Sequence, residues 1–168
     1  MNVTKFHWKI SETLNVNINS DELWAIISSP SNLELFHPFC NKNPIINWPG
    51  KNSIDEIYYY SGLIYQRKFI NWIEGVGYDL LIGEKNGHQS LVTWKIQNNG
   101  QTSLTISIYP YKYNTGIKLI KFIPYSILVK PLLKKYVKSV MLGLECFIKS
   151  NKTVQKNQFG YIRFFSNK

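Results

Sequence analysis

The first patterned segment of the chain alternates apolar with polar residues. Its apolar side chains fall on even positions, at Phe6, Trp8, Ile10, Leu14, Val16 and Ile18. A period of two places these residues on one face of a β-strand. An extended segment of this length would reach about 43 Å, so we expect the strand to bend and the sheet to be strongly curved.

Two short helices are predicted after this strand. Asn19 or Ser20 can cap the first, and the following Asp21 and Glu22 suit the positive end of its dipole. Ser29 can cap the second, with Pro30 at its first helical position and His37-Pro38 beyond its end. Each helix has an apolar side, formed by Leu23, Trp24 and Ile27 in the first and by Leu33, Leu35 and Phe36 in the second.

Residues 54–109 predict an antiparallel meander of five or six strands. Asn-Gly pairs at 86–87 and 99–100 separate alternating segments, which is the strongest short-range signal for a hairpin. One face of the meander should be buried and the other wet. The residues expected on the buried face are Tyr78, Leu80, Ile82, Val92, Trp94, Ile96, Leu104, Ile106 and Ile108.

A long amphipathic helix is predicted to begin at Pro131. Apolar residues recur at three- and four-residue spacing, while Lys134, Lys135 and Lys138 lie off that stripe. The preceding segment, 116–130, mixes apolar residues with lysine, matches no simple period and is interpreted as an insertion. We therefore predict one domain over 1–150 and a tail over 151–168. The aromatic residues of the tail should dock it on the domain.

Composition agrees with a single globular domain. The 168 residues are 44% hydrophobic and 15% aromatic, which excludes a disordered chain. The net charge of +10 makes this a basic protein, and residues 1–84 carry −3 while residues 85–168 carry +13. Such a field favours anionic partners, although it also serves solubility.

Several features bear on location and on chemistry. The first residues show no secretory signal, and Cys40 and Cys146 are too few for a disulfide framework, so a cytoplasmic protein with reduced thiols is expected. Lysines and prolines interrupt the most apolar stretch, so no membrane span is predicted. His37 and Cys40 lack a second ligand pair, and no dinucleotide or phosphate-loop motif occurs. We expect neither a metal nor a cofactor.

The order of these elements resembles the helix-grip fold of the SRPBCC superfamily, which includes START-type lipid carriers, polyketide cyclases and plant pathogenesis-related allergens. The segments ELWAIISSPSNLELFHPF, NWIEGVGYDLLIG and VKSVMLGLECFI carry the resemblance, which spans nearly the whole chain. It implies an α+β fold in which a curved antiparallel sheet wraps around the long C-terminal helix. It also implies an internal cavity for an apolar or amphipathic small molecule, lipid-like or polyketide-like.

The predicted site follows from that resemblance and from the strand pattern. The expected ligand-binding residues are Trp8, Tyr58, Tyr60, Phe69, Tyr78, Leu80, Trp94, Tyr136 and Val140. For the aromatic residues among them, core packing and cavity lining overlap. Binding is the favoured function, and the alternative is a cyclase or dehydratase acting on the same kind of ligand.

Acid and base candidates for such an enzyme occur on the predicted strands. They are Glu56, Tyr58, Tyr60, Tyr65, Arg67 and Asp79, but their spacing selects no pair. We expect Arg67 and Asp79 to be ordinary surface charges on the outer face of the sheet. The catalytic residues, if any, stay unassigned.

The basic, apolar stretch 112–138 suggests a further partner. Its lysines and apolar residues suit an anionic membrane surface, while the alternative is a lid that packs on its own domain. A protein-binding module is a further alternative. Nucleic acid is disfavoured because no recognition motif accompanies the charge.

Overall fold

The computed structural model describes residues 8–114, 123 and 125–168. The predicted start of the first strand at Phe6 lies outside the described residues, as does most of the 116–130 segment.

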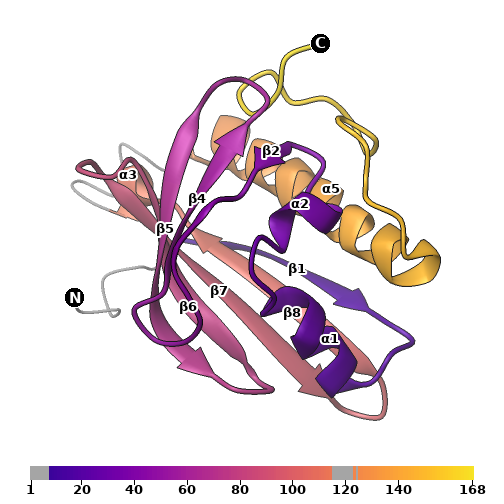
Figure 1. Ribbon diagram of the computed structural model, residues 1–168. Helices are drawn as coiled ribbons and strands as arrows, with labels where there is room; N and C mark the ends of the chain where they lie inside the picture. The colour runs from indigo at the N-terminus through magenta and orange to yellow at the C-terminus, as the bar shows by residue number, and fades with distance from the viewer. Residues whose placement is uncertain (1–7, 115–122, 124) are drawn as a thin grey trace.

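Among the described residues, eight strands form one antiparallel sheet (Figure 1). The strand order is β1-β8-β7-β6-β5-β4-β2, and β3 also pairs with β4. The strands are β1 (Ile10–Asn15), β2 (Cys40–Lys42), β3 (Ile45–Asn47), β4 (Ile54–Tyr59), β5 (Ile64–Ile73), β6 (Gly77–Gly83), β7 (Gln89–Asn98) and β8 (Thr102–Tyr109). The predicted meander corresponds to β4 to β8.

The first strand is shorter than its alternation predicted. β1 pairs with β8 from Ile10↔Ile108 to Asn15↔Ser103, and the amide of Val16 donates the last bond to the carbonyl of Thr102. β8 begins at Thr102, so the alternating residues beyond Val16 have no strand to pair with. Periodicity marked the exposed and buried faces, but the length of the partner strand determined where β1 ends.

The helices are α1 (Ser20–Ile27), α2 (Leu33–Phe36), α3 (Tyr111–Asn114) and α5 (Lys130–Ser150), which is preceded by a π-helical turn, η2 (Tyr125–Val129). Asn19 caps α1 by accepting from the Glu22 amide at 2.8 Å, and the Glu22 carboxylate accepts from the Asn19 amide at 3.1 Å. This reciprocal pair satisfies two backbone donors that a helix start otherwise leaves unpaired.

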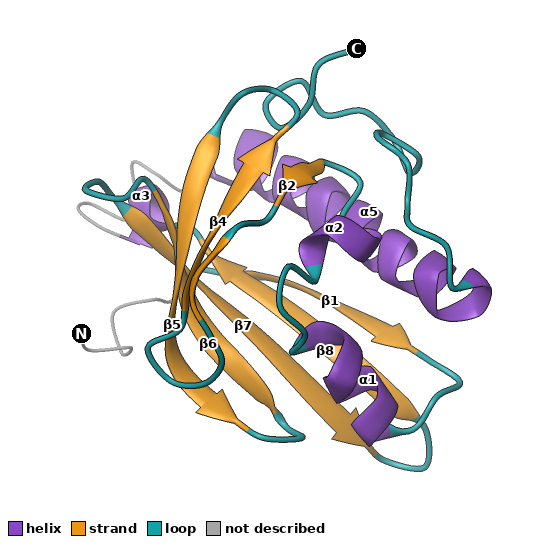
Figure 2. Cartoon of the chain, in the orientation of Figure 1, coloured by secondary structure: helices purple, strands orange, loops and turns teal. Residues whose placement is uncertain are grey.

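Figure 2 shows α1, α2 and α5 on the same side of the sheet. Side chains from that side form one core, which includes Trp94, Leu104 and Leu144. Gly143 allows α5 to pass directly over the end of α2, since a Cβ at this position would lie 2.0 Å from the Phe36 carbonyl oxygen. The short helices thus support α5 above the sheet.

The segment after α5 packs back on the body of the molecule. The amides of Val154 and Asn157 each donate at 3.0 Å, to the carbonyls of Leu35 and Pro38. The Ser139 hydroxyl on α5 donates to the Phe159 carbonyl at 2.8 Å. Phe165 is buried, so the segment contributes a side chain to the interior.

Candidate ligand-binding cavity

A cavity of about 350 Å³ lies between the inner face of the sheet and α5. Most of its wall is aliphatic or aromatic. The sheet contributes Ile57, Leu80, Ile82, Val92, Trp94, Ile106 and Ile108, α5 contributes Leu133, Tyr136, Val137 and Val140, and the C-terminal segment contributes Phe164 and Phe165.

Strand alternation explains why these residues meet. Leu80 and Ile82 on β6 face the same side as Val92 and Trp94 on β7, because Leu80 is paired with Val92 in the register of the two strands. Ile106 and Ile108 on β8 continue the row, with Ile108 opposite Val92. The sheet therefore presents a continuous apolar surface to the helix.

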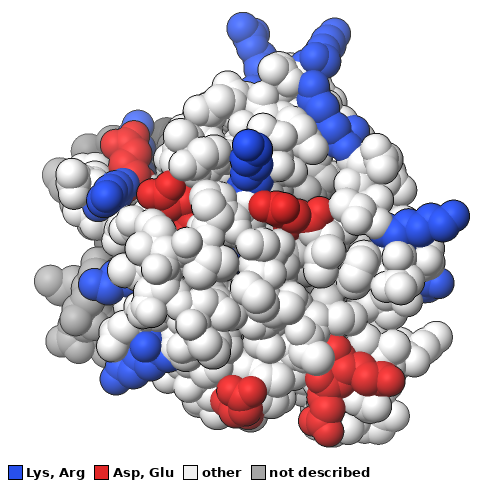
Figure 3. Space-filling model, in the orientation of Figure 1, with Lys and Arg blue, Asp and Glu red and all other residues white. Residues whose placement is uncertain are grey.

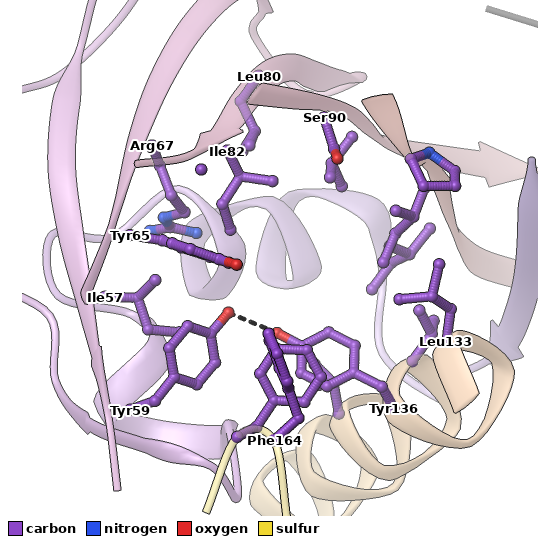
Figure 4. A pocket seen from close by; sticks show the side chains of 18 of the residues that line it. Ile57, Tyr59, Tyr65, Arg67, Leu80, Ile82, Ser90, Leu133, Tyr136 and Phe164 are labelled. Atoms are coloured by element: carbon purple, nitrogen blue, oxygen red, sulfur yellow. Dashed lines mark hydrogen bonds between the residues drawn. The ribbon is translucent and has the colours of Figure 1, made fainter. Parts of the chain in front are cut away.

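One end of the cavity is polar. Tyr59 on β4, together with Tyr65 and Arg67 on β5, brings two hydroxyls and a guanidinium to this end. His37, just after α2, and Tyr136 on α5 complete the group. Figure 4 shows the hydroxyl oxygens of Tyr59 and Tyr65 pointing into the space between the walls.

Arg67 is held there by a buried ion pair. Its Nε donates to Asp55 Oδ1 at 2.7 Å and its Nη2 donates to Asp55 Oδ2, while Asn32 and Asn43 also accept from Nη2. Asp55 is completely buried and Arg67 nearly so. Burial alone would lower the pKa of Arg67, but the Asp55 carboxylate outweighs it and raises the pKa above its usual value. Arg67 therefore stays cationic, and its ion pair with Asp55 offsets that charge.

This placement corrects the expectation that Arg67 is a surface charge on the outer face. Asp55 and Arg67 are directly opposite each other on β4 and β5, so their side chains share one face. That face is the inner one, because Phe69, two residues further along β5, is fully buried. Asp79, by contrast, alternates with the buried Tyr78 and Leu80 and accepts from Asn71 at 3.2 Å on the exposed side.

A hydrogen-bonded series connects three other residues of the polar end. His37 Nε2 lies 2.8 Å from the Tyr136 hydroxyl, which lies 3.1 Å from the Tyr59 hydroxyl. Burial, reinforced by the charge of Arg67, lowers the pKa of His37 to about 3. Burial also raises the pKa values of Tyr59 and Tyr136 above the ordinary phenol value. All three groups are therefore neutral near pH 7.

The structure brings four of the nine predicted ligand-binding residues to the cavity wall: Leu80, Trp94, Tyr136 and Val140. Five are placed elsewhere. Phe69 and Tyr78 are buried in the aromatic core beside the cavity, and Trp8 stacks on Tyr125 at 5.1 Å. Tyr58 bonds to Glu56 on the outer side of β4, and Tyr60 lies under the Lys156 ammonium.

Along β4 the buried residues lie in the opposite phase to the predicted one. Tyr58 and Tyr60 were predicted to line the cavity, but the inward residues are Asp55, Ile57 and Tyr59. A pairing of the Asp55 and Arg67 charges across two adjacent strands was the signal that could have fixed the phase. The sequence marks His37 only as a candidate metal ligand, and nothing in its spacing indicates the contact with Tyr136.

The described residues contain no group of three His, Cys, Asp or Glu side chains that could hold a metal ion. Cys40 and Cys146 are free thiols, and burial raises the pKa of Cys40 to about 12. Within 8–114, 123 and 125–168, no helix is long and apolar enough to cross a bilayer.

Charge is unevenly spread over the surface. In Figure 3 acidic side chains gather over α1, whereas basic side chains stand over the C-terminal segment and the end of α5. Ahead of α5, Ile123, Ile127 and Leu128 are each about two thirds exposed. The exposed lysines Lys130, Lys134, Lys135 and Lys138 follow them.

No protein-family model and no curated protein matches the chain. Solved structures do. The allergen Ara h 8.0201 matches with a TM-score of 0.60 at 13% identity, over 86% of this chain and 99% of its own. Major latex-like protein 151 of Panax ginseng matches with a TM-score of 0.59 at 12% identity, over 83% and 95%.

The chain adopts the helix-grip fold. DynU16, from the dynemicin biosynthetic locus, also matches, with a TM-score of 0.61 at 12% identity over 89% of this chain. The match covers 51% of DynU16, so this helix-grip chain corresponds to about half of that protein. At these identities the similarity establishes the fold, which was predicted from the order of the elements.

Proposed function

We propose that the protein binds a hydrophobic or amphipathic small molecule, lipid-like or polyketide-like, in the cavity between the sheet and α5, as a member of the SRPBCC superfamily. The observation that carries this proposal is an internal cavity with a mostly apolar wall and a small number of polar groups, several of them gathered around Arg67, which is the usual form of a small-molecule site. Its volume of about 350 Å³ is near the lower limit for such sites. A molecule of a few rings or a short chain therefore fits better than a two-chain lipid.

Binding is better supported than the alternative of cyclase or dehydratase catalysis. An efficient acid or base has a pKa near the working pH. The pKa of His37 is about 3, and those of Tyr59 and Tyr136 lie above the ordinary phenol value. None of these three groups exchanges a proton readily near pH 7, although all can form hydrogen bonds.

The test is to fill the cavity from α5. Val140 lines the cavity, whereas Lys138, two residues earlier, is exposed. N-phenyl-1-naphthylamine, an uncharged dye that fluoresces in apolar surroundings, should bind the unaltered protein. Val140→Trp should weaken dye binding at least about tenfold, while the matched Lys138→Trp should leave it unchanged. Circular dichroism spectra confirm that both variants are folded. Equal dye binding by both variants, or no binding by the unaltered protein, contradicts the proposal.

The exposed apolar residues ahead of α5 support a second function, docking on an anionic membrane surface through the described part of 112–138. Ile123, Ile127 and Leu128 expose apolar surface next to lysines, which is the combination that enters a lipid interface while cations meet acidic headgroups. Val129 and Leu133, close by in sequence, line the cavity. A ligand taken from a membrane would thus have a short route inward.

Vesicle sedimentation tests this second function. Vesicles with 30% phosphatidylserine should retain the protein more strongly than pure phosphatidylcholine, and added salt should weaken retention because it screens exposed charges. Ile127→Ser with Leu128→Ser should lower retention by the acidic vesicles. Retention that is unchanged in this double variant would leave only an electrostatic attraction and remove the support for membrane docking.

A further inference from the structure

At the polar end of the cavity, the series formed by His37, Tyr136 and Tyr59 contains more donor hydrogens than hydrogen bonds. His37 Nδ1 accepts from the Phe39 amide at 3.2 Å, so the neutral imidazole carries its single proton on Nε2. That proton points to the Tyr136 hydroxyl at 2.8 Å. The direction of the first bond in the series is thereby fixed, with His37 donating and Tyr136 accepting.

The series contains one more donor hydrogen than it has hydrogen bonds. The His37 Nε2–H, the Tyr136 hydroxyl and the Tyr59 hydroxyl supply three donor hydrogens, but they share only the two contacts to Tyr136 and between the two tyrosines. No other acceptor among the described residues meets either hydroxyl. One phenol hydrogen of the pair therefore has no partner among the described residues.

Tyr65 adds a second such donor. Its ring packs edge-on against Tyr59, with ring centroids 5.9 Å apart, and its hydroxyl has no hydrogen-bond partner among the described residues. Figure 4 shows that this hydroxyl and that of Tyr59 approach the same part of the cavity. An oxygen placed between them could accept from both.

The charges nearby favour an uncharged oxygen. Arg67 is the one cation that the described residues bring to this end, and the Asp55 carboxylate already offsets it through two hydrogen bonds. A buried carboxylate on the ligand would have no unpaired cation here, and an unpaired buried charge is strongly disfavoured. A carbonyl needs only the hydroxyl hydrogens.

We propose that the ligand is a mostly apolar molecule carrying an uncharged carbonyl oxygen, as in a ketone or ester, and that the hydroxyls of Tyr59 and Tyr65 bind this oxygen. The inference rests on the proposed binding function and specifies the chemical class of the ligand. Tyr59 and Tyr65 are specificity-determining residues in this arrangement, while His37 and Tyr136 are positioning residues.

The test compares two probes of nearly the same shape, 2-acetylnaphthalene and 2-isopropenylnaphthalene, in which a CH₂ group replaces the carbonyl oxygen. Each probe is titrated against protein that has bound N-phenyl-1-naphthylamine, and the loss of dye fluorescence gives the affinity of that probe. The unaltered protein should bind the ketone about threefold to tenfold more tightly, as expected for one or two hydrogen bonds. The carboxylate probe 2-naphthoate should bind more weakly than the ketone.

Removing the hydroxyls should remove the preference. In the double variant Tyr59→Phe, Tyr65→Phe the two neutral probes should bind within about twofold of each other, with the alkene little changed. Tyr65→Phe alone breaks no bond within the described protein, so it reports on the preference even if the double variant is unstable. Tyr58→Phe is the matched control, since Tyr58 is adjacent to Tyr59 but bonds to Glu56 outside the cavity.

The outcomes separate this inference from the proposed function. Equal binding of ketone and alkene by the unaltered protein overturns the inference while leaving ligand binding intact. A preference that survives in the double variant, or naphthoate binding more tightly than the ketone, also overturns it. If the dye itself does not bind the unaltered protein, the proposed function fails as well.

Discussion

The buried imidazole of His37 makes the stability of the fold depend on pH. Burial, and then the charge of Arg67, lower the pKa of His37 from 6.5 to about 3 in the native protein. In the unfolded chain the same group titrates near 6.5. A second proton would also have to displace the hydrogen bond that Nδ1 accepts from the Phe39 amide.

The direction and size of the effect follow from these two pKa values. Between about pH 6.5 and pH 3 the unfolded chain binds the proton and the native protein does not, so the free energy of unfolding falls as the pH falls. One pKa unit corresponds to about 1.36 kcal/mol. Lowering the pH from 7.5 to 5.0 should therefore remove about 2 kcal/mol through His37, and the contribution is fully present above pH 6.5.

Urea unfolding at pH 7.5 and pH 5.0 measures this effect. His37→Gln has no titrating group at this position, so its loss of stability between the two pH values should be about 2 kcal/mol smaller than that of the unaltered protein. His88→Gln is the control, because His88 stacks on Tyr111 away from the His37 series. The reasoning is refuted if His37→Gln and the unaltered protein lose the same stability on acidification.

Three further predictions concern stability, each measured by urea unfolding. Arg67→Met leaves the buried Asp55 carboxylate unpaired and should cost about 3 to 5 kcal/mol, whereas changing Asp55 to Leu in the same protein should restore part of the loss. Gly143→Ala places a Cβ against the Phe36 carbonyl and should cost about 1 to 3 kcal/mol despite the helix propensity of Ala, while Lys138→Ala should stay within about 0.5. Tyr136→Phe leaves His37 Nε2–H without its acceptor and should cost about 1 to 3 kcal/mol. A change smaller than 0.5 kcal/mol in any of the three would contradict the contact assigned to it.

Much of the fold could be predicted because its signals are local. Asn-Gly turns and strict alternation on β7 and β8 are properties of a few adjacent residues. The stripe on α5 is equally local, and it located the helix to within one residue at its start. The order of these elements is then enough to predict the helix-grip fold.

The polar end of the cavity depends on contacts between distant residues. Along β4, Ile54 and Ile57 lie in opposite phases, so local pattern favours neither face. The phase is set by Arg67 on the next strand, and the side chains of Asn32, just before α2, and Asn43, just after β2, also accept from that guanidinium. The selection of Tyr58 and Tyr60 over Tyr59 reflects this lack of local information.

The two margins of the sheet affect how the protein behaves beside other copies of itself. β2 and β3 are three residues each, pair with β4 in a shifted register, and are separated by Asn43 and Pro44. Proline lacks an amide hydrogen, and short interrupted strands are poor templates for strand addition. At the other margin α5 lies along β1, and Lys134 Nζ on α5 lies 3.5 Å from Glu12 Oε1 on β1. In the described part of the chain, the margin formed by β2 and β3 offers no long, regular row of backbone groups, which disfavours edge-to-edge aggregation through that margin during expression and concentration.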